Sequence, residues 1–376
     1  MVKLILLGLL AGALFSSTFI LNELMSSAGG DWFWSASLRY LFMWLMLTAI
    51  IAIQQGAGRI GELWAIFRAH WGFWCVTGGI GFGLFYTGIC YAGDHVAGWV
   101  VAATFMFTVV TSLLVLVAFG QRFDKKFVLY ALLVFIGVIL VNVSEGLHAA
   151  SIADAASTPM AEMLLYGALP ALIAAFSYPI GNQLVWQVSY NSRKHSAALQ
   201  KARDDNSTYS SNSSDINTII NPDGTIITQS DACAHTHVPI QHKSALQQLI
   251  ARIPAIETDL LQNAFNKVWL MSLGSLPFWL VLGIIVRPEL PSSSQVFNTL
   301  LVALLAGVGA TSIFLYAREQ AQTSSEVAGV DSTQASEVIF ALIGGILLLG
   351  NVLPSAMGLF GIGLIILGLI LFAKDG

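Results

Sequence analysis

The sequence predicts an all-α integral membrane protein of about ten transmembrane helices, arranged as two inverted five-helix repeats. Three observations predict this fold: the composition, a series of apolar runs of membrane-spanning length, and a similarity between the two halves. The 376 residues are 56% hydrophobic and 10% charged, with a mean hydropathy of +0.74. Soluble domains carry about 25% charged residues, so we expect lipid rather than water to surround most of this chain.

Apolar runs bounded by polar or turn residues mark the predicted spans. Each is close to the roughly 20 residues that a helix needs to cross hydrocarbon. The first five runs cover residues 4–25, 32–53, 71–92, 97–119 and 127–144. The second five cover residues 163–187, 267–286, 298–317, 331–350 and 354–373. The first run stays apolar beyond its small residues, so we expect an uncleaved helix rather than a signal peptide.

Basic residues predict the orientation, because cytoplasmic loops carry an excess of lysine and arginine. Arg39 falls inside the second span, and only Arg287 lands in an outer loop when the N-terminus is cytoplasmic. The other fifteen of the 17 basic residues are then cytoplasmic: Lys3, Arg59, Arg68, Arg122, Lys125, Lys126, Arg193, Lys194, Lys201, Arg203, Lys243, Arg252, Lys267, Arg318 and Lys374. We expect a multi-pass protein of the cell (inner) membrane with both termini in the cytoplasm.

The predicted organisation has four parts. Residues 1–145 form the first repeat, residues 146–188 an outer loop and the sixth helix, and residues 266–376 the remaining four helices. Between them, residues 189–265 form a polar cytoplasmic insert that we expect to be largely disordered. The insert contains a Cys and His group whose spacing matches no closed zinc site, so we expect no metal: Cys233, His235, His237 and His242.

The two halves of the chain share short sequences at long offsets. Val96-Ala97-Gly98 before the fourth span recurs as Val327-Ala328-Gly329 before the ninth, 231 positions later. Residues of the first span also match residues of the sixth at an offset of 160: Ser17, Ile20 and Asn22 with Ser177, Ile180 and Asn182. Five spans is an odd number, so the second copy enters the membrane inverted. Inverted repeats provide two equivalent states that open to opposite sides.

Four short motifs carry a resemblance to a known group of proteins. They are Leu21-Asn22-Glu23, the segment 34–40 (WSASLRY), Ala97-Gly98-Trp99 and the segment 331–335 (DSTQA). With the ten-span plan, they resemble the drug/metabolite transporter superfamily, and its multidrug resistance efflux branch in particular. The resemblance covers the chain except the insert, whose length does not match the pattern of that family. It implies secondary transport, often export, driven by an ion gradient or exchange, without an ATPase domain or cofactor.

Ionisable side chains within the spans are few, and each costs a few kcal/mol in hydrocarbon. Glu23 lies in the outer part of the first span, and Arg39 lies about 10 Å into the second. A contact between them would be either a coupling or substrate site or a structural ion pair. Burial would favour protonated Glu23, whereas an ion pair with Arg39 would favour the charged form. Proton-driven antiport through Glu23 is therefore one hypothesis.

Other polar and aromatic residues complete the candidate site. Glu337 and Gln334 share a helix face at the start of the ninth span and could line an inner vestibule or a solvated helix end. Amide side chains could bind substrate or hydrogen-bond neighbouring helices: Asn22, Asn182 and Gln183. Aromatic rings could form a wall for lipophilic cations or pack in the core: Tyr86, Trp99 and Tyr178.

Glycines and prolines predict where helices approach closely or bend. Gly79 and Gly83 have the spacing that lets two membrane helices come together. The tenth span is expected to pack tightly through Gly358, Gly361, Gly363 and Gly368. Kinks are expected at the prolines within spans: Pro170, Pro179 and Pro277.

Several function classes are less consistent with this sequence. A net charge of -4 argues against nucleic acid as a partner. An enzyme acting on a lipid-linked substrate would need clustered carboxylates or histidines at one membrane surface, and His70, His95 and His148 are scattered. We therefore predict a non-enzymatic transporter of small organic molecules, an exporter with proton coupling as one option. A metabolite importer or exchanger of the same fold is the alternative, and the oligomeric state stays open.

Overall fold

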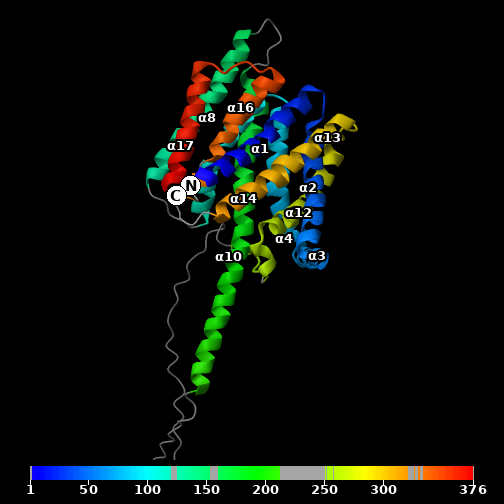
Figure 1. Cartoon of the computed structure of the whole chain (residues 1–376), viewed down its shortest axis with the longest axis vertical. Coiled ribbons are helices and arrows are strands. Elements are labelled where there is room, and N and C mark those ends of the chain that lie inside the picture. Colours follow the sequence, from blue (N-terminus) through cyan, green and yellow to red (C-terminus); the bar gives the residue numbers. More distant parts are fainter. Residues whose placement is uncertain are drawn as a thin grey trace, which may run out of the picture. The chain divides into compact units, whose positions relative to one another are not determined.

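The computed structural model describes residues 2–119, 125–152, 160–211, 250, 252–256, 258–320, 326, 329–330 and 333–375. Within these residues the regular secondary structure is helical, and no strand occurs among them (Figure 1). The first half contains α1 (Val2–Ser27), α2 (Trp32–Gln55), α3 (Gly58–Ala69), α4 (Trp71–Gly78), η1 (Gly79–Leu84), α5 (Phe85–Gly93), α6 (Gly98–Phe105), α7 (Thr108–Ala118) and α8 (Lys125–Ile152).

The second half has the same order of spans. It contains α9 (Met160–Glu162), η2 (Met163–Ala168), α10 (Leu169–Ser211), η3 (Asp259–Gln262), α12 (Ala264–Val286), α13 (Ser293–Val302), η4 (Ala303–Ala310), α14 (Thr311–Gln320), η5 (Thr333–Ala335), α16 (Ser336–Leu349) and α17 (Ala356–Asp375). Elements that follow without a break form one span, such as α4, η1 and α5.

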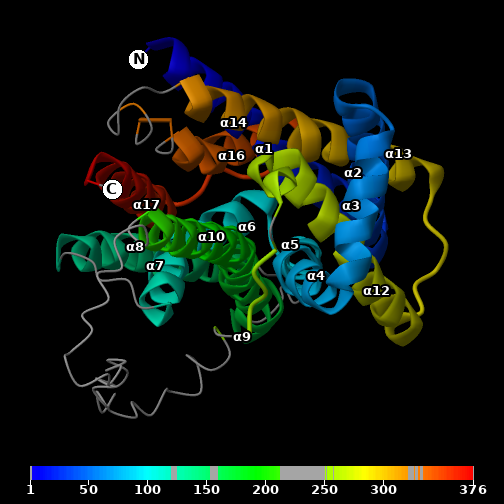
Figure 2. The same cartoon turned by 90° about the horizontal axis from the view of Figure 1, so that it is seen from below.

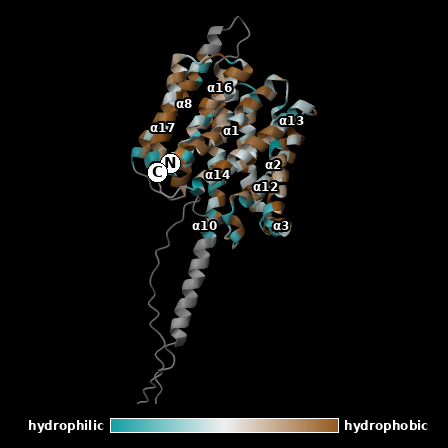
Figure 3. Cartoon of the chain, viewed as in Figure 1, coloured by the Kyte–Doolittle hydropathy of each residue, from teal (hydrophilic) through white to brown (hydrophobic). Residues whose placement is uncertain are grey.

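Ten helical segments match the ten predicted spans. In the described residues nine are long and apolar enough to cross a membrane, and Thr333–Leu349 is a shorter apolar helix. Hydrophobic residues run along α8 and α17, while hydrophilic residues lie toward helix ends (Figure 3). Lipid-facing positions such as Leu280 and Ile284 are more than two-thirds exposed. The prediction of an all-α membrane protein with about ten spans is confirmed.

The chain separates into two compact units. One comprises Met1–Val185 with Leu260–Gly376, and the other comprises Trp186–Asp259. In the second unit, α10 remains helical to Ser211, so the segment predicted as a largely disordered insert begins as a helix. Residues 212–249, with Cys233 and its three neighbouring histidines, lie outside the described residues. The predicted domain boundaries therefore stay predictions.

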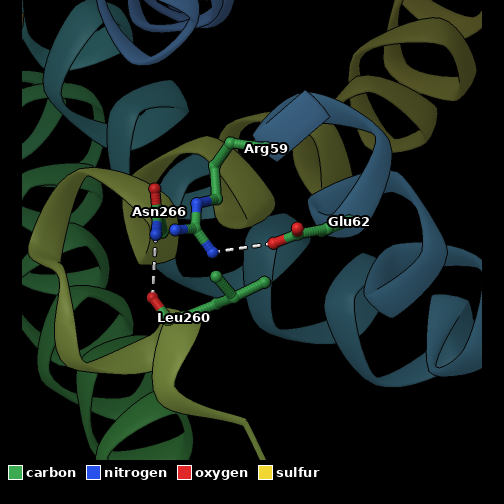
Figure 4. A network of polar contacts seen from close by, with 4 residues as sticks. All are labelled: Arg59, Glu62, Leu260 and Asn266. Atoms are coloured by element: carbon green, nitrogen blue, oxygen red, sulfur yellow. Dashed lines mark hydrogen bonds and ion pairs between the residues drawn. The ribbon is translucent and has the colours of Figure 1, made fainter. Parts of the chain in front are cut away.

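A short helix that the sequence analysis did not predict, α3, connects the second and third spans. Leu63 is its one buried residue, whereas Trp64 on another face is 46% exposed. Arg59 and Glu62 form an ion pair of 2.7 Å on this helix (Figure 4). In the same view Asn266 of α12 donates to the carbonyl of Leu260 at 2.9 Å. An apolar side facing the protein and a polar side are typical of a helix lying along the membrane surface.

The helices pack in pairs that follow the predicted repeat. The second and seventh spans (α2, α12), the fourth and ninth (α6, α16) and the fifth and tenth (α8, α17) each contact their own counterpart. The first span packs on the eighth and ninth, as α1 contacts η4, α14 and α16. Its counterpart α10 packs on the third at Gly81 and Gly181, and on the fourth at Thr111. Two related copies would produce this pattern (Figure 2).

Helix caps reveal a correspondence that the sequence comparison missed. Asp31 caps α2 by accepting from the amide of Phe33 at 2.7 Å. Asn263 caps α12 in the same way, accepting from Phe265 at 2.8 Å. These caps lie 232 positions apart, close to the offset of the fourth and ninth spans. The sixth span has an offset of only 160, so the extra length of the second copy lies between its first two spans.

The third span of each half contains a stretch of π-helix. These stretches are η1 and η4, and a further stretch, η2, lies at the start of the sixth span. A π-helix widens the turn and leaves some carbonyls without their usual partner, and such stretches are common at functional sites. Matching irregularities in the third and eighth spans indicate that both halves distort at the same structural position.

The fifth and tenth spans, α8 and α17, lie side by side through glycines (Figures 1 and 2). A Cβ on Gly361 would lie 2.8 Å from the carbonyl oxygen of Gly137, and one on Gly368 would lie 2.7 Å from Val134. Gly358 is similarly enclosed by Ser144. The prediction is wrong for Gly363, which has nothing within 4 Å because it lies on the other face of α17.

The glycines of the third span also differ from the prediction. Gly83 packs on the ring of Phe278, but Gly79 has only ordinary contacts with it. Close backbone approaches are instead at Gly78, against Met271 and Ser275, at Gly81, against Gly181, and at Gly88, against Pro170. The third span therefore uses two different faces, one toward α12 and one toward α10.

Substituting the two glycines of α17 with alanine should separate contact from helix propensity. Each substitution gains up to about 1 kcal/mol from propensity. Gly361→Ala should nevertheless destabilise the protein by about 1–3 kcal/mol, because the new Cβ meets a backbone oxygen of α8. Gly363→Ala should be neutral or stabilising. Thermal unfolding in mild detergent measures both, and equal melting temperatures would contradict this packing.

Pro179 lies inside α10, and its missing amide frees the carbonyl of Ala175 one turn earlier. The hydroxyl of Thr111, which is fully buried in α7, donates to this carbonyl. In hydrocarbon an unpartnered carbonyl is costly, so this bond stabilises the helix at the proline. It also joins the fourth and sixth spans.

Removal of this hydroxyl should be measurably destabilising. Thr111→Val keeps the side-chain shape but leaves the Ala175 carbonyl unpaired, with an expected loss of about 1–3 kcal/mol. Thr77→Val is the matched control, since Thr77 is equally buried but its hydroxyl has no partner in the described residues. Chemical denaturation in detergent compares the two. A Thr77→Val variant as unstable as Thr111→Val would contradict the role of the bond.

Candidate functional site

Arg39 lies at the centre of a buried polar cluster formed by the first three spans. It is 7% exposed, and its guanidinium lies 4.1 Å from the centroid of the Tyr86 ring. Nη1 donates to the hydroxyl of Thr18 at 3.2 Å, and Nε is buried without a partner in the described residues. Asn22 Nδ2 donates to the Tyr86 hydroxyl at 3.1 Å. The cluster thus joins α1, α2 and α5.

Aromatic rings enclose this cluster on the side of the seventh span. Tyr40 stacks on Phe82 with a centroid distance of 4.7 Å and on Trp279 with a distance of 6.1 Å. It also meets the Tyr86 ring edge to face. Such pairs contribute about 0.5–1.5 kcal/mol each beyond burial and hold their rings in defined positions. The rings therefore hold Tyr40 and Tyr86 in place, and these two rings lie beside the Arg39 guanidinium.

Glu23 has a different set of partners, near the C-terminal end of α1. One carboxylate oxygen accepts from the backbone amide of Gly98 at 2.7 Å, at the N-terminus of α6. The other accepts from Asn351 Nδ2 at 2.7 Å, in the connection between the ninth and tenth spans. Both carboxylate oxygens of Glu23 are therefore engaged as hydrogen-bond acceptors. We call this arrangement the outer latch: Glu23, Gly98 and Asn351.

The contact considered between Glu23 and Arg39 is not formed in the described structure. Arg39 reaches α1 at Thr18, five residues before Glu23, which corresponds to about 7.5 Å along the helix. Glu23 instead accepts from the backbone amide of Gly98 and the side chain of Asn351, near the C-terminal end of α1. Neighbouring helices and a short connection allowed the pair, but the two side chains lie at different depths.

Glu337 is a buried carboxylate without a hydrogen-bond partner among the described residues. It lies in the first turn of α16 and is 8% exposed. The start of α16 packs tightly on α1, because a Cβ on Gly12 would meet the hydroxyl of Ser336 and lie 3.3 Å from the carbonyl of Thr333. Glu337 therefore lies inside the bundle, where an isolated ionised carboxylate is costly.

The sixth span contributes Tyr178 to the same interior. Its ring lies 5.0 Å from that of Phe85, next to Tyr86, and 5.9 Å from that of Phe105. The hydroxyl lies within electrostatic range of both Glu337 and Arg39. Because its neighbours are interior groups, we infer that the 37% of Tyr178 that stays exposed faces the inside of the bundle.

The remaining candidates are more scattered. Gln183 is buried, and its Nε2 has no partner in the described residues. Trp99 is 2% exposed in α6, as expected of a packing residue. Asn182 and Gln334 are exposed. The structure therefore brings together Asn22, Arg39 and Tyr86, with Tyr178 nearby.

Several residues of the site were not among the sequence candidates. Thr18 and Tyr40 lie against Arg39, Phe82 and Trp279 stack on Tyr40, and Asn351 completes the outer latch. The position of Trp279 could have indicated a role in the site, because tryptophan prefers membrane interfaces and Trp279 lies in the middle of a span. The sequence does not single out Asn351, because asparagine is common in loops.

Potential metal ligands do not gather in the described part of the chain. No group of three or more His, Cys, Asp or Glu side chains there could hold a metal ion.

Residues 2–375 match the family described as "EmrE: Putative multidrug resistance efflux transporter". The chain belongs to this family. The match covers both halves and the segment between them, and it confirms the resemblance seen in the four short motifs. The EmrE-type family is a family of transporters, so the chain is a multi-pass membrane protein of a transporter family.

Two relatives resemble this EmrE family member over most of its length. The uncharacterized protein YjlA of Bacillus subtilis (strain 168) is 29% identical, over 98% of this chain and 94% of its own length. An uncharacterized 42.1 kDa protein of Shouchella clausii, in the intracellular alkaline protease 3' region, is 28% identical over 85% of this chain. The match spans 65% of the Shouchella protein's length.

A solved structure described as "Crystal structure of protein" shares the fold of this family member. The two have a TM-score of 0.51 and are 13% identical. The match covers 99% of this chain and 96% of the solved one. At this identity the likeness shows a common fold alone.

Proposed function

We propose that the protein is a secondary-active transporter that exports small organic molecules by alternating access and couples export to protons through Glu337. The observation that carries this proposal is the buried Glu337 carboxylate, which has no hydrogen-bond donor in the described residues. Intramembrane carboxylates are functional by default, since an unused one would be costly to keep. The fold, the cluster around Arg39 and the family support the assignment.

A proton carrier must change its charge during the cycle, and this requirement separates the two carboxylates. Glu23 accepts two hydrogen bonds of 2.7 Å, so both of its carboxylate oxygens already have partners in this state. Glu337 has no such donors in the described residues, and an ionised carboxylate without donors is costly there until water or substrate reaches it. We therefore assign the coupling role to Glu337 instead of Glu23.

Alternating access requires two states of similar energy, which inverted repeats supply. The outer latch joins the first span to the fourth and to the connection after the ninth, and in the proposed cycle it holds the outer end closed. Opening the outer end would break hydrogen bonds at Glu23. The expected cycle therefore exchanges the outer latch for closure at the inner end.

The experiment is a transport screen in sealed proteoliposomes with and without an imposed proton gradient. A panel of small organic cations, anions and neutral compounds is offered, and accumulation is followed together with lumenal pH. We expect at least one compound to move against its gradient while protons move the other way. Transport that ignores the proton gradient for every compound moved would refute proton coupling. Movement of a compound in the opposite direction would indicate an importer.

The proposed orientation places both chain ends and residues 189–265 in the cytoplasm of the cell membrane. It rests on the distribution of lysine and arginine. Reporter tags at both ends and at residue 230 should all report the cytoplasmic side. A tag at residue 230 on the opposite side from the ends would be inconsistent with ten spans.

A further inference from the structure

We infer that Arg39 is a binding site for the anionic group of the substrate, so that the transported molecules are small organic acids or zwitterions with an apolar or aromatic body. This inference rests on the proposed function, because it names the substrate class of the proposed transporter. It departs from the expectation of lipophilic cations that the aromatic residues suggested.

The first argument is the charge of Arg39 and the lack of a counter-charge. An arginine side chain stays protonated in proteins. The side chains that act most strongly on Arg39 are Tyr86, Tyr40 and Cys90, and Tyr178 also lies within electrostatic range; all four are ordinarily neutral at physiological pH. In the described residues no carboxylate lies within ion-pair distance of it. A buried cation in this setting favours the arrival of an anion.

The second argument is the hydrogen bonding of the guanidinium. The Tyr86 ring covers one face at 4.1 Å, and Thr18 takes one bond from Nη1. Nε remains buried without a partner. Carboxylates bind arginine through two parallel hydrogen bonds, commonly along an edge that includes Nε. The cluster therefore holds the guanidinium in place and leaves a donor for a ligand.

The third argument is the apolar surface beside Arg39. Tyr178 is 37% exposed and packs with Phe85 and Phe105, next to the Tyr86 ring. A flat apolar body could lie against Tyr178 while its carboxylate meets Arg39. Glu337 also lies within electrostatic range of Tyr178, so an ammonium group on the same ligand would have a partner. This arrangement extends the class to zwitterions.

A structural tie is the competing explanation, in which Arg39 only fastens three helices. Both explanations predict that removing Arg39 destabilises the protein. They differ in ligand preference, because only a binding site distinguishes an acid from its uncharged analogue.

Thermal unfolding of the purified full-length protein in an uncharged detergent tests the inference. Four probes are compared at equal ionic strength: 3-phenylpropionate, its amide, 3-phenylpropylammonium and tetraphenylphosphonium. We expect the acid to raise the melting temperature with saturation, and the amide to have no effect. Stabilisation by either cation without stabilisation by the acid would overturn the inference, as would equal effects of acid and amide.

Variants locate the site. Arg39→Gln should weaken the effect of 3-phenylpropionate by tenfold or more, and Arg39→Lys should restore part of it. Arg59→Gln is the control, because Arg59 is paired with Glu62 on α3. If Arg39→Gln does not fold, Tyr178→Ala should weaken binding of the acid without removing the preference for acid over amide. An unchanged affinity in Arg39→Gln, or in Tyr178→Ala, would contradict the placement.

These binding measurements need no gradient and no transport. Acid binding through Arg39 without coupled transport would uphold the inference and refute the proposed function. Coupled transport of cations alone, with no acid binding, would uphold the proposed function and refute the inference.

Discussion

Replacing Glu337 with glutamine is expected to abolish proton-driven transport while leaving exchange of substrate between the two sides intact. Glutamine matches the shape of the side chain but cannot release a proton, so the cycle loses its coupling ion. Accumulation against a gradient should fall on the order of a hundredfold, whereas counterflow should persist because it needs no net proton movement. Proteoliposome assays of accumulation and of counterflow, each compared between the variant and the original protein, measure both effects.

Controls make this result specific to Glu337. Glu62→Gln removes an exposed carboxylate that pairs with Arg59 on α3, and it should leave both activities unchanged. Glu337→Asp keeps an exchangeable proton and should retain part of the coupling. If Glu337→Gln accumulates substrate as well as the original protein does, Glu337 is not the coupling group.

Replacing Glu23 with alanine is expected to shift the protein toward a state that is open at its outer end. The substitution removes two acceptors, for Gly98 N and Asn351 Nδ2, each at 2.7 Å. Hydrogen bonds to a charged group contribute about 1.5–3 kcal/mol each, so the loss of both should change the ratio of the two states by roughly a hundred- to ten-thousandfold. Asn351→Asp should act in the same direction, because it faces Glu23 with a second carboxylate.

Spin-label distances between Ser27 and Val352, two exposed positions near the outer latch, report this shift. We expect a longer distance to gain population in Glu23→Ala and in Asn351→Asp. Glu289→Gln, in an exposed outer loop, is the control and should leave the distribution unchanged. Identical distributions in all four proteins would mean that the latch does not hold the outer end closed.

The spans and their order could be predicted from sequence because each depends on a local property. An apolar run of about 20 residues leaves a helix as the main solution in lipid, since every backbone group must find a partner within the segment. The first span was predicted at 4–25 and is found at Val2–Ser27, and the seventh was predicted at 267–286 and is found at Ala264–Val286. The amphipathic α3 was missed because it is short and less apolar.

The partners of the site residues could not be predicted in the same way. Arg39 and Tyr86 were both candidates, but their contact joins residues far apart in the sequence. Glu23 and Arg39 looked compatible by helix position, yet one helix turn or more of depth separates their contacts on α1. The glycines of α17 could not be told apart from the sequence either. Their number indicated close packing, but which of them faces α8 depends on how α17 is rotated about its axis, and Gly361 faces α8 whereas Gly363 does not.

The sequence gives the least indication of one property of the site, which is that Glu337 has no hydrogen-bond partner among the described residues. Glu337 could have been a solvated helix end or an interior carboxylate, and these alternatives depend on how deeply the start of α16 is enclosed by α1. The tight contacts at Gly12 and Gly8, against Ser336 and Thr333, decide this in favour of the interior. Its assignment to proton coupling remains our proposal.

Accessibility of Tyr178 from the two sides of the membrane tests the central claim most directly. A Tyr178→Cys variant, with Cys75, Cys90 and Cys233 replaced, is treated with a membrane-impermeant thiol reagent in vesicles of each orientation. Leu280→Cys, at a position 70% exposed on a lipid-facing helix, is the unreactive control. The account predicts that Tyr178→Cys is labelled from either side. Labelling from one side only, or from neither, would contradict an interior that opens alternately to both compartments.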